Sequence, residues 1–473
     1  MSKRSKIKII ILLICIIGYL LINLNIGKNT FSNIKLLLND EQIELIKKYI
    51  FPYKFISQQQ QTISNQQQII SDQQQTISKQ KQSTNSFDWS ALELLIKESE
   101  REIVTRENTL KLANNITLRK YKLTSGFYYG IGNHFPGSGY IDFYEGNIIV
   151  LSSRGVLAFK KNIEDTEENF KQIKNNINEF IGIEQYKTNN TLSIKDIFIF
   201  NNKVFISYTE EIKEDCWNTS IIYGDINYEN INFEKLFTPK KCIHSTKNID
   251  NSFNAHSSGG RIQSFDKNNI LLSVGEYLER YLAQDIKSVN GKIIKVNIEN
   301  GDYEIISMGH RNPQGLYFDK KNNFIIETEH GPYGGDEINI IEVSKIGKDK
   351  IQNYGWAISS AGEHYGGKSE RNKALYEKYP LYKSHSEKGF IEPLKSFVPS
   401  IGISEIVKIK HNKYVIGSLR DKSLYFFELN EKKQIMNLDR VEVDERVRDL
   451  VFEDDKLYLF MENTASIGVI NLN

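Results

Sequence analysis

The stretch QGLYFDKKNNFIIETEHG at residues 314–331 has the pattern of a β-hairpin that ends in polar residues. Its first part is an apolar strand, and the asparagines of the DKKNN run suit a tight turn. Its second strand, from Phe324 to Ile326, is apolar at consecutive positions. Such a run is expected where a strand is buried on both faces.

Five further segments have the same order of apolar strand, short polar turn, apolar strand and polar tail. They lie at residues 141–155, 195–211, 260–277, 404–421 and 448–464. Similar hairpins separated by insertions of variable length are typical of a β-propeller, in which each blade contributes one inner hairpin. We therefore predict an all-β, six-bladed β-propeller over residues 115–473, with a helical insertion at residues 166–181. A pair of β-sandwiches is the alternative, but it gives no reason for one hairpin to recur.

A propeller gathers equivalent positions of its blades around one central channel. The polar tails after the second strands and the loops before the first strands are therefore expected to meet at one end of that channel. The tails contain Arg154, Glu276, His330, Gly331, Pro332 and Arg420, and the loops contain His256, Arg311, Asn312, Arg446 and Arg448.

The N-terminus has the pattern of a membrane anchor. Residues 1–8 are basic and precede an apolar run at residues 9–22, which a weaker segment extends to residue 26. The run is short, because a spanning helix needs about 20 residues, or about 17 at the least. A cleaved signal peptide is the alternative, but no pair of small residues marks a cleavage site. We predict a transmembrane anchor at residues 9–26, a cytoplasmic N-terminus at residues 1–8, and a periplasmic or otherwise extracytoplasmic propeller.

Isoleucine recurs at every seventh position of residues 56–83, in the heptads ISQQQQT, ISNQQQI, ISDQQQT and ISKQKQS. This spacing places the isoleucines along one seam of a helix. Residues 27–106 are therefore predicted to form a helical, Gln-rich coiled-coil stalk, ending in an amphipathic helix at residues 90–106. Membrane anchoring would favour its assembly into a homo-oligomer. A disordered Gln-rich linker is the alternative.

Charge and cysteine content limit the partners and the compartment. Positive and negative side chains nearly balance, at 61 Lys and Arg against 59 Asp and Glu, so we expect no nucleic-acid partner. Cys216 and Cys242 are the only cysteines of the predicted exported part, and they flank a predicted hairpin at residues 219–236. An oxidising compartment permits a disulfide between them, whereas two buried free thiols are the alternative.

Three motifs concentrate polar residues around the quoted hairpin: GHRNPQGLYFD at residues 309–319, ETEHGPYGGDEINII at residues 327–341 and NYGW at residues 353–356. Their order resembles the family of soluble glucose dehydrogenases, aldose-sugar dehydrogenases and sorbosone dehydrogenases. These are six-bladed β-propellers that use pyrroloquinoline quinone (PQQ) and calcium. The resemblance implies a sugar dehydrogenase that oxidises an aldose or related sugar at C1 to a lactone and passes the electrons to a quinone or cytochrome partner.

The resemblance also implies roles for individual residues. His256, in NAHSSGGRI, would be the general base, and the carbonyl groups of Gly331 and Pro332 would bind calcium. The residues implied to bind the cofactor are Arg311, Asn312, Gln314, His330, Arg420, Arg446 and Arg448. For His330, bracing of the Gly-Pro turn is an equal alternative.

The chain departs from the family at several positions. Ala255 precedes His256 where some relatives have Asp, and the spacing from His256 to Arg261 is one residue longer. Glu276 stands where Asp is common, and Arg420 stands where the family has Lys. Each change bears on activity, substrate choice or cofactor binding.

Two other functions fit part of these observations. A non-catalytic, membrane-tethered propeller would bind a carbohydrate or protein ligand, and an oligomeric stalk would suit it through multivalency. His256 would then be a structural histidine. A calcium-dependent lactonase would rely on carboxylate and amide ligands around a central metal, whereas the arginine-rich loops suit an anionic cofactor better.

Overall fold

The fold is described from a computed structural model of the chain. The structure describes residues 107–113, 116–123, 138–153, 155–165, 168–182, 185, 191–348 and 350–472. The predicted anchor, the predicted stalk with its helix at residues 90–106, and Arg154 lie outside these residues. The chain divides into two compact units, Met1–Ala91 and Leu92–Asn473, and every described residue belongs to the second. Among the described residues, no helix combines the length and the apolar character that a membrane crossing requires.

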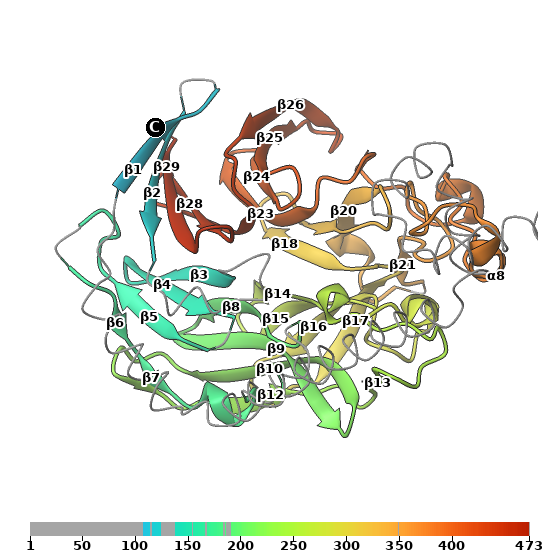
Figure 1. Ribbon diagram of the computed structural model, residues 1–473, viewed down its shortest axis with the longest axis horizontal. Coiled ribbons are helices and arrows are strands. Elements are labelled where there is room, and N and C mark those ends of the chain that lie inside the picture. The colour runs from blue at the N-terminus through green and yellow to red at the C-terminus, as the bar shows by residue number, and fades with distance from the viewer. Residues whose placement is uncertain are drawn as a thin grey trace, which may run out of the picture. The chain divides into compact units, whose positions relative to one another are not determined.

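Six mainly antiparallel sheets stand side by side in a ring (Figure 1). Each of them contains the two strands of one predicted hairpin, and the six-bladed β-propeller is therefore confirmed. The first three blades, from inner to outer strand, are β3 (Gly139–Tyr144), β4 (Asn147–Ser152), β5 (Leu157–Lys160) and β6 (Lys171–Gln172); β8 (Ile194–Phe200), β9 (Lys203–Lys213), β10 (Cys216–Asp225) and β12 (Glu234–Phe237), with β13 (Ile243–His244) also on β10; and β14 (Gly259–Asp266), β15 (Asn269–Val274), β16 (Lys292–Asn297), β17 (Tyr303–Met308) and β21 (Gln352–Asn353).

The other three blades follow the same order. They are β18 (Pro313–Asp319), β19 (Phe324–Glu329), β20 (Asp336–Glu342) and β22 (Lys395–Phe397); β23 (Ile403–Lys410), β24 (Lys413–Ser418), β25 (Ser423–Leu429) and β26 (Ile435–Glu442); and β27 (Val447–Glu453), β28 (Lys456–Met461), β29 (Ser466–Asn471), β2 (Thr117–Lys122) and β1 (Glu107–Lys111).

The sixth blade joins strands from both ends of the described chain. Strand β2 pairs antiparallel with β29, with Leu118 opposite Ile470 and Lys122 opposite Ser466. Strand β1 adds to the free edge of β2. Backbone hydrogen bonds between the first and last strands therefore close the ring. Because β1 begins at Glu107, the propeller starts before residue 115, the predicted boundary.

The first strand of each blade lines the central channel. Each of these inner strands contacts the inner strands of both neighbouring blades. A bulge bends a strand and re-aims its side chains, so residues at the start of these strands turn toward the channel. Register shifts near the start of five inner strands lie between Ile194 and Asp196, Gly259 and Ile262, Pro313 and Gly315, Ile403 and Ile406, and Val447 and Asp449.

The hydrophobic core lies between the blades. Every residue of β19 is buried. Ile326 of β19 packs with Ile403 and Tyr414 of the next blade in one apolar cluster. The consecutive apolar positions of the second strands are explained by this arrangement, because each sheet is covered on both faces by its neighbours.

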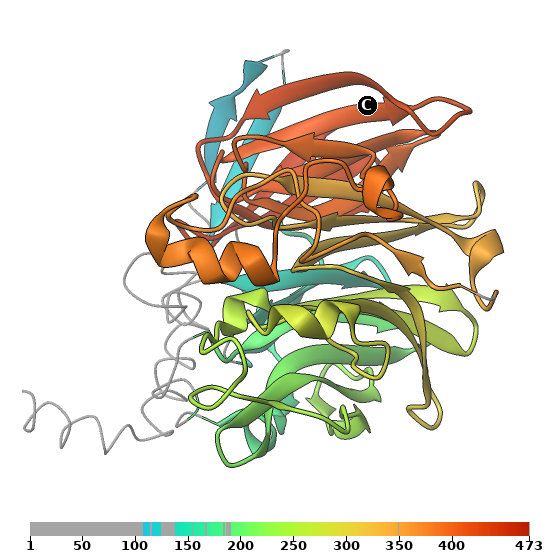
Figure 2. The same cartoon turned by 90° about the vertical axis from the view of Figure 1, so that its right-hand side faces the viewer.

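Two long insertions lie on the same side of the propeller (Figure 2). One joins β15 to β16 and contains the 3-10 turn η4 (Arg280–Gln284), and the other lies between β21 and β22 and contains α8 (Lys373–Lys378). Ala283, Trp356 and Tyr379 form a buried apolar cluster that joins the two insertions. Further 3-10 turns are η2 (Ile177–Glu179), η3 (Ala255–Ser257), η5 (Val343–Lys345), η6 (Glu370–Asn372) and η7 (Ser386–Lys388).

The predicted helix at residues 166–181 is wrong. Within the described part of this segment, β6 and β7 (Lys174–Asn175) are extended, and η2 is a single turn. Strand β6 pairs with β5, and β7 pairs with β11 (Asn230–Ile231). Backbone pairing with strands distant in the sequence outweighs the local helical propensity here.

The predicted disulfide is confirmed. Cys216 and Cys242 are bonded, and their Cα atoms lie 5.2 Å apart. The hairpin that they flank is confirmed as well, because β10 pairs antiparallel with β12.

Candidate active site

Arg261, on β14, forms ion pairs with carboxylates from three other inner strands. Its Nη1 lies 2.9 Å from Asp196 Oδ1 and 2.6 Å from Asp449 Oδ1, and its Nε lies 2.8 Å from Glu405 Oε2. The same guanidinium donates to backbone carbonyls of β18 and β27. One side chain therefore links five of the six inner strands across the channel.

This ion cluster contains more carboxylates than cations. Burial raises the pKa of Glu405 to about 7 and the pKa of Asp196 well above its usual value, although Arg261 opposes the shift in both. Burial therefore opposes full ionisation of Glu405 and Asp196, and the Arg261 guanidinium offsets part of this effect.

Glu462, directly after β28, binds both arginines of the R-x-R pattern. Its Oε1 accepts a hydrogen bond from Arg448 Nε at 2.6 Å, and its Oε2 accepts one from Arg446 Nε at 3.0 Å. Burial alone would raise the pKa of Glu462, but the guanidinium groups of Arg448 and Arg446 outweigh it and hold the pKa below its usual value. One carboxylate thus holds two cations close together.

Gln314 connects this arginine pair to the GHRNPQG loop. Arg448 Nη1 donates to Gln314 Oε1 at 3.1 Å, and Gln314 Nε2 donates to Asn312 Oδ1 at 3.0 Å. Asn312 Oδ1 also accepts from the backbone N–H of Gly259 at 3.1 Å. A continuous hydrogen-bonded chain therefore joins the sixth, fourth and third blades.

Arg311 binds the Gly-Pro turn that follows β19. Its Nη1 donates to the carbonyl of His330 at 2.9 Å and to the carbonyl of Gly331 at 2.6 Å. Its guanidinium also lies over the ring of Trp356, 5.4 Å from the centroid. The Gly331 carbonyl, an expected calcium ligand, is therefore already bound to a cationic side chain, and Pro332 beside it is buried.

The turn itself requires glycine at residue 331. A Cβ there would lie 2.0 Å from the carbonyl oxygen of Gly335. Asp336 anchors the turn, because its Oδ1 accepts from the N–H of Gly331 at 3.1 Å and its Oδ2 accepts from Gly402 at 2.7 Å. The His330 ring is bonded through Nε2 to the backbone carbonyl of Ile403 at 2.5 Å, and so braces the same turn.

His256 lies in η3, the turn that leads into β14. The side chain of Asn254 caps this turn by accepting from the His256 N–H at 2.8 Å. Lys195 Nζ donates to the carbonyl of the preceding residue, Ala255, at 3.1 Å. The backbone on both sides of the His256 Cα is therefore held by side chains.

The imidazole of His256 is neutral over most of the pH range. The residue is exposed, yet surrounding protein atoms desolvate the ring enough to lower its pKa to about 4, and the positive charges of Lys195 and Arg448 add to this shift. A neutral imidazole can accept a proton.

The segment between His256 and Arg261 contains the bulge that opens β14. Gly259 and Gly260 occupy this bulge with φ angles of +64° and +118°. A Cβ on Gly260 would lie 2.3 Å from the Cβ of Lys195. Two glycines with positive φ angles therefore form this bulge, and Arg261 directly after them reaches the channel.

Arg420 lies at the edge of this arrangement. It is exposed, and the carbonyl of its neighbour Leu419 accepts from Arg446 Nη1 at 3.2 Å. The other predicted site residues are joined to this arrangement by hydrogen bonds, with two exceptions. Pro332 follows Gly331 in the turn, and His256 is close enough to Arg448 and His330 for their charges to lower its pKa. We call this end of the channel the mouth, defined by Lys195, His256, Arg311, Asn312, Gln314, His330, Gly331, Arg446, Arg448 and Glu462.

Two residues of the mouth, Glu462 and Lys195, were not among the site residues predicted from the sequence. Glu462 lies in the polar tail after the second strand of the last predicted hairpin. Because the corresponding tails of other hairpins contain predicted site residues, the position of Glu462 alone would have identified it. Lys195 has no comparable signal, because it opens the predicted hairpin at residues 195–211 and lies neither in a polar tail nor in a loop before a first strand.

The chain is similar in sequence to one known family of proteins. The sequence profile of the Glucose / Sorbosone dehydrogenase family matches residues 191–469. The aldose sugar dehydrogenase YliI of Escherichia coli is 26% identical over 294 residues, covering 57% of this chain and 72% of that protein. This protein belongs to the Glucose / Sorbosone dehydrogenase family, since the profile covers more than half of the chain.

Solved structures show the same fold. The apo form of the soluble aldose sugar dehydrogenase from Escherichia coli superposes with a TM-score of 0.56 at 21% identity, covering 71% of this chain and 96% of that one. The PQQ-bound aldose sugar dehydrogenase from Streptomyces coelicolor superposes with a TM-score of 0.51 at 19% identity, covering 75% and 98%.

Proposed function

We propose that this protein oxidises an aldose or a related sugar at C1 to the lactone, with PQQ and calcium as cofactors. The observation that carries the proposal is the charge of the mouth, where two guanidinium groups share one carboxylate beside a neutral imidazole. A relative named as an aldose sugar dehydrogenase and a similar fold solved with PQQ bound support the substrate class and the cofactor.

The residues of the mouth fit an anionic quinone. Arg446 and Arg448 would bind its carboxylates as charge-assisted donors. The amide groups of Asn312 and Gln314 lie beside them, and Arg420 at the edge would add a further cation. When bound, the quinone supplies the two-electron acceptor for the hydride that leaves C1.

His256 would act as the general base. As the C1–H bond breaks, the C1 hydroxyl loses its proton to the imidazole, and the C1–O bond becomes the carbonyl of the lactone. The lowered pKa keeps this ring unprotonated and ready to accept that proton. Lys195 would assist by holding η3, and with it the imidazole, in place.

Calcium fits the Gly331–Pro332 turn under one condition. Ca²⁺ binds backbone carbonyl oxygens, but the Gly331 carbonyl accepts a hydrogen bond from Arg311. A guanidinium and a divalent cation on one oxygen would repel each other. We therefore propose that calcium binds together with the quinone, because a cofactor carboxylate would draw Arg311 away from the carbonyl.

The N-terminal part would place the enzyme at a membrane. We propose that residues 9–26 anchor the chain with its N-terminus in the cytoplasm, and that residues 27–106 form a stalk that supports a homo-oligomer. Support comes from the basic flank, the apolar run and the isoleucine heptads. Electrons would then pass to a quinone or a cytochrome.

Dye reduction by the reconstituted full-length chain tests the proposal. With PQQ and Ca²⁺ present, aldoses are expected to reduce the dye, and His256→Ala is expected to lower the rate at least about 100-fold. His244→Ala is the matched control, because His244 is also exposed but lies outside the mouth. A folded protein that binds PQQ yet oxidises no member of a broad sugar and alcohol panel would contradict the proposal. A protein that takes up no PQQ would instead be a non-catalytic propeller that binds a carbohydrate or protein ligand.

A further inference from the structure

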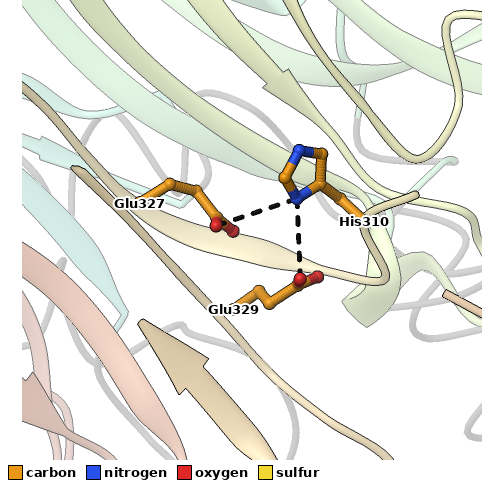
Figure 3. Close-up of side chains that lie close together, drawn as sticks. All are labelled: His310, Glu327 and Glu329. Atoms are coloured by element: carbon orange, nitrogen blue, oxygen red, sulfur yellow. Dashed lines mark ion pairs between the residues drawn. The ribbon is translucent and has the colours of Figure 1, made fainter. Parts of the chain in front are cut away.

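Three side chains behind the mouth form a compact, buried group of potential metal ligands (Figure 3). His310 lies in the loop between β17 and β18, and Glu327 and Glu329 lie on β19. The two glutamates are separated by one residue, so they point to the same face of the strand. His310 and Glu327 are 0% exposed and Glu329 is 3% exposed.

The distances within this group are too long for hydrogen bonds. His310 Nδ1 lies 3.5 Å from Glu329 Oε1 and 3.7 Å from Glu327 Oε2. Hydrogen bonds between nitrogen and oxygen span about 2.7–3.2 Å. Two ligand atoms that each lie about 2.0–2.1 Å from one tetrahedral metal ion are separated by about 3.3 Å. The observed separations are therefore close to those of ligands that share an ion.

Three polar atoms of this group lack hydrogen-bond partners among the described residues. His310 Nδ1 and both carboxylate oxygens of Glu327 are buried, and none of them has a hydrogen bond of normal geometry to a described residue, although the side chain of Asn339 lies close to Glu327. Burying such groups without partners is unfavourable. A ligand bound between them would replace the hydrogen bonds that they lack. The Oδ1 of Asn339 is a further buried acceptor without a partner, and its Nδ2 donates to Glu329 Oε1 at 3.1 Å.

The surroundings of His310 suit a metal-bound imidazole. Its Nε2 is paired with Ser307 Oγ at 2.8 Å, which leaves Nδ1 to point at the two glutamates. The ring stacks on Tyr354, with centroids 4.9 Å apart, and this contact fixes its orientation. Metal-ligating histidines commonly donate their other ring N–H to a neighbouring oxygen acceptor, and the Ser307 hydroxyl can accept in this way.

We propose that His310, Glu327 and Glu329 bind a divalent transition-metal ion, with Asn339 Oδ1 as the fourth ligand. An imidazole together with carboxylates suits Zn²⁺ or Mn²⁺, whereas Ca²⁺ and Mg²⁺ prefer oxygen ligands alone. Two carboxylates balance the charge of the ion, which makes the buried group neutral. Full burial without an open position indicates a structural site.

The ion would stabilise the loop that carries the mouth. Glu329 accepts from the backbone N–H of Arg311 through Oε2, while its Oε1 faces His310. A metal ion at this point would therefore fix residues 310 and 311 relative to β19. This site is independent of the proposed redox chemistry and can be tested without PQQ.

Metal analysis of the full-length chain tests the site. After growth with Zn²⁺ and Mn²⁺ and removal of free metal, the wild type is expected to retain about one ion per chain. Glu327→Gln keeps the side-chain shape but weakens the ligand, and it is expected to lose the ion. Glu276→Gln is the matched control, because Glu276 is also fully buried with both oxygens unpaired, and it is expected to keep the ion.

Two further measurements keep the test decisive. Returning Zn²⁺ or Mn²⁺ to chelator-treated protein is expected to raise the Tm of the wild type and of the control by a few degrees, but not that of Glu327→Gln. Co²⁺ taken up by the wild type is expected to show the visible absorption of a tetrahedral nitrogen and oxygen site, a readout that needs no variant. Wild-type protein without stoichiometric metal and without a Co²⁺ spectrum would overturn the proposal, as would metal retained by a folded Glu327→Gln variant.

Discussion

Arg261 Nη1 lies 2.6 Å from Asp449 Oδ1, although 188 residues separate them in the sequence. They belong to the inner strands β14 and β27, in the third and sixth blades. This contact is one of several by which a single guanidinium joins strands from different blades. The blades are therefore connected by polar contacts in the channel beneath the mouth as well as by the apolar surfaces between them.

Arg261→Met is expected to destabilise the protein strongly. It leaves the carboxylates of Asp196, Glu405 and Asp449 buried without their cation, and breaking a buried ion pair costs about 3–5 kcal/mol. Urea denaturation measures the loss. Arg440→Met removes a surface arginine that pairs with Asp421, and it is expected to cost within about 1 kcal/mol.

The cost of Arg261→Met is also expected to depend on pH. Burial already raises the pKa of Glu405 and Asp196, and loss of Arg261 would raise both pKa values further. The folded variant would then bind more protons than the unfolded chain, so it gains stability as the pH falls. The loss of stability should be smaller near pH 5 than near pH 8. An equal loss at both would show that the carboxylates are not buried as described.

Glu462→Gln is expected to destabilise the protein without cofactor and to strengthen its response to PQQ. The change leaves Arg446 and Arg448 close together without their carboxylate, which is expected to cost about 3 kcal/mol. An anionic ligand would relieve this repulsion. Thermal denaturation with and without PQQ should therefore show a larger rise in Tm for Glu462→Gln than for the wild type.

Glu442→Gln is the control for that comparison. Glu442 also pairs with an arginine, at 3.6 Å, but its side chain is 63% exposed. Its loss is expected to change stability by about 0.5 kcal/mol or less. If Glu462→Gln behaves like this surface variant, the two guanidinium groups do not depend on Glu462 for their placement.

The pKa of His256 can be measured directly. Desolvation and neighbouring cations lower it to about 4, below the unfolded value of about 6.5. The unfolded chain therefore binds the proton first, and this group reduces stability as the pH falls from about 6.5 to about 4. NMR of the cofactor-free protein, with the signal assigned by His256→Gln, should show a midpoint near 4. A midpoint near 6.5 would mean that the ring is freely solvated.

Calcium and PQQ are expected to bind cooperatively. Arg311 occupies the Gly331 carbonyl in this structure, so Ca²⁺ alone should bind weakly at the turn. PQQ should increase the affinity for Ca²⁺, and by thermodynamic reciprocity Ca²⁺ should increase the affinity for PQQ by the same factor. Calorimetric titration of each ligand with and without the other measures this coupling. Tight binding of Ca²⁺ at the turn without the quinone would contradict the exchange of partners proposed for Arg311.

The repeated hairpins made the fold predictable from the sequence. Each is a local pattern of strand, turn and strand, and the consecutive apolar residues of β19 reflect burial between blades. The helix predicted at residues 166–181 was wrong because the partner of Lys174–Asn175 lies at Asn230–Ile231, beyond any local pattern. Register between distant strands is not visible in local hydrophobic periodicity.

The candidate site was predictable only where its residues lie in continuous motifs. Arg311, Asn312 and Gln314 share one motif, and the structure joins them to the turn at Gly331 and to Arg448. The ion cluster of Arg261 was not predictable, because Asp196 and Asp449 come from separate strands whose positions along the channel depend on their bulges. The sharing of Glu462 by two arginines likewise depends on how β27 and β28 pair.

A titration of the folded full-length chain with PQQ in the presence of Ca²⁺, followed by the absorbance of the quinone, tests the central claim most directly. The wild type is expected to bind about one equivalent, and Arg448→Met should lower the affinity at least about tenfold, because a charge-assisted hydrogen bond contributes about 1.5–3 kcal/mol. Arg440→Met, which removes an arginine outside the mouth, should leave the affinity unchanged. A folded wild-type protein that shows no saturable change with PQQ would contradict the assignment of the mouth as a quinone site.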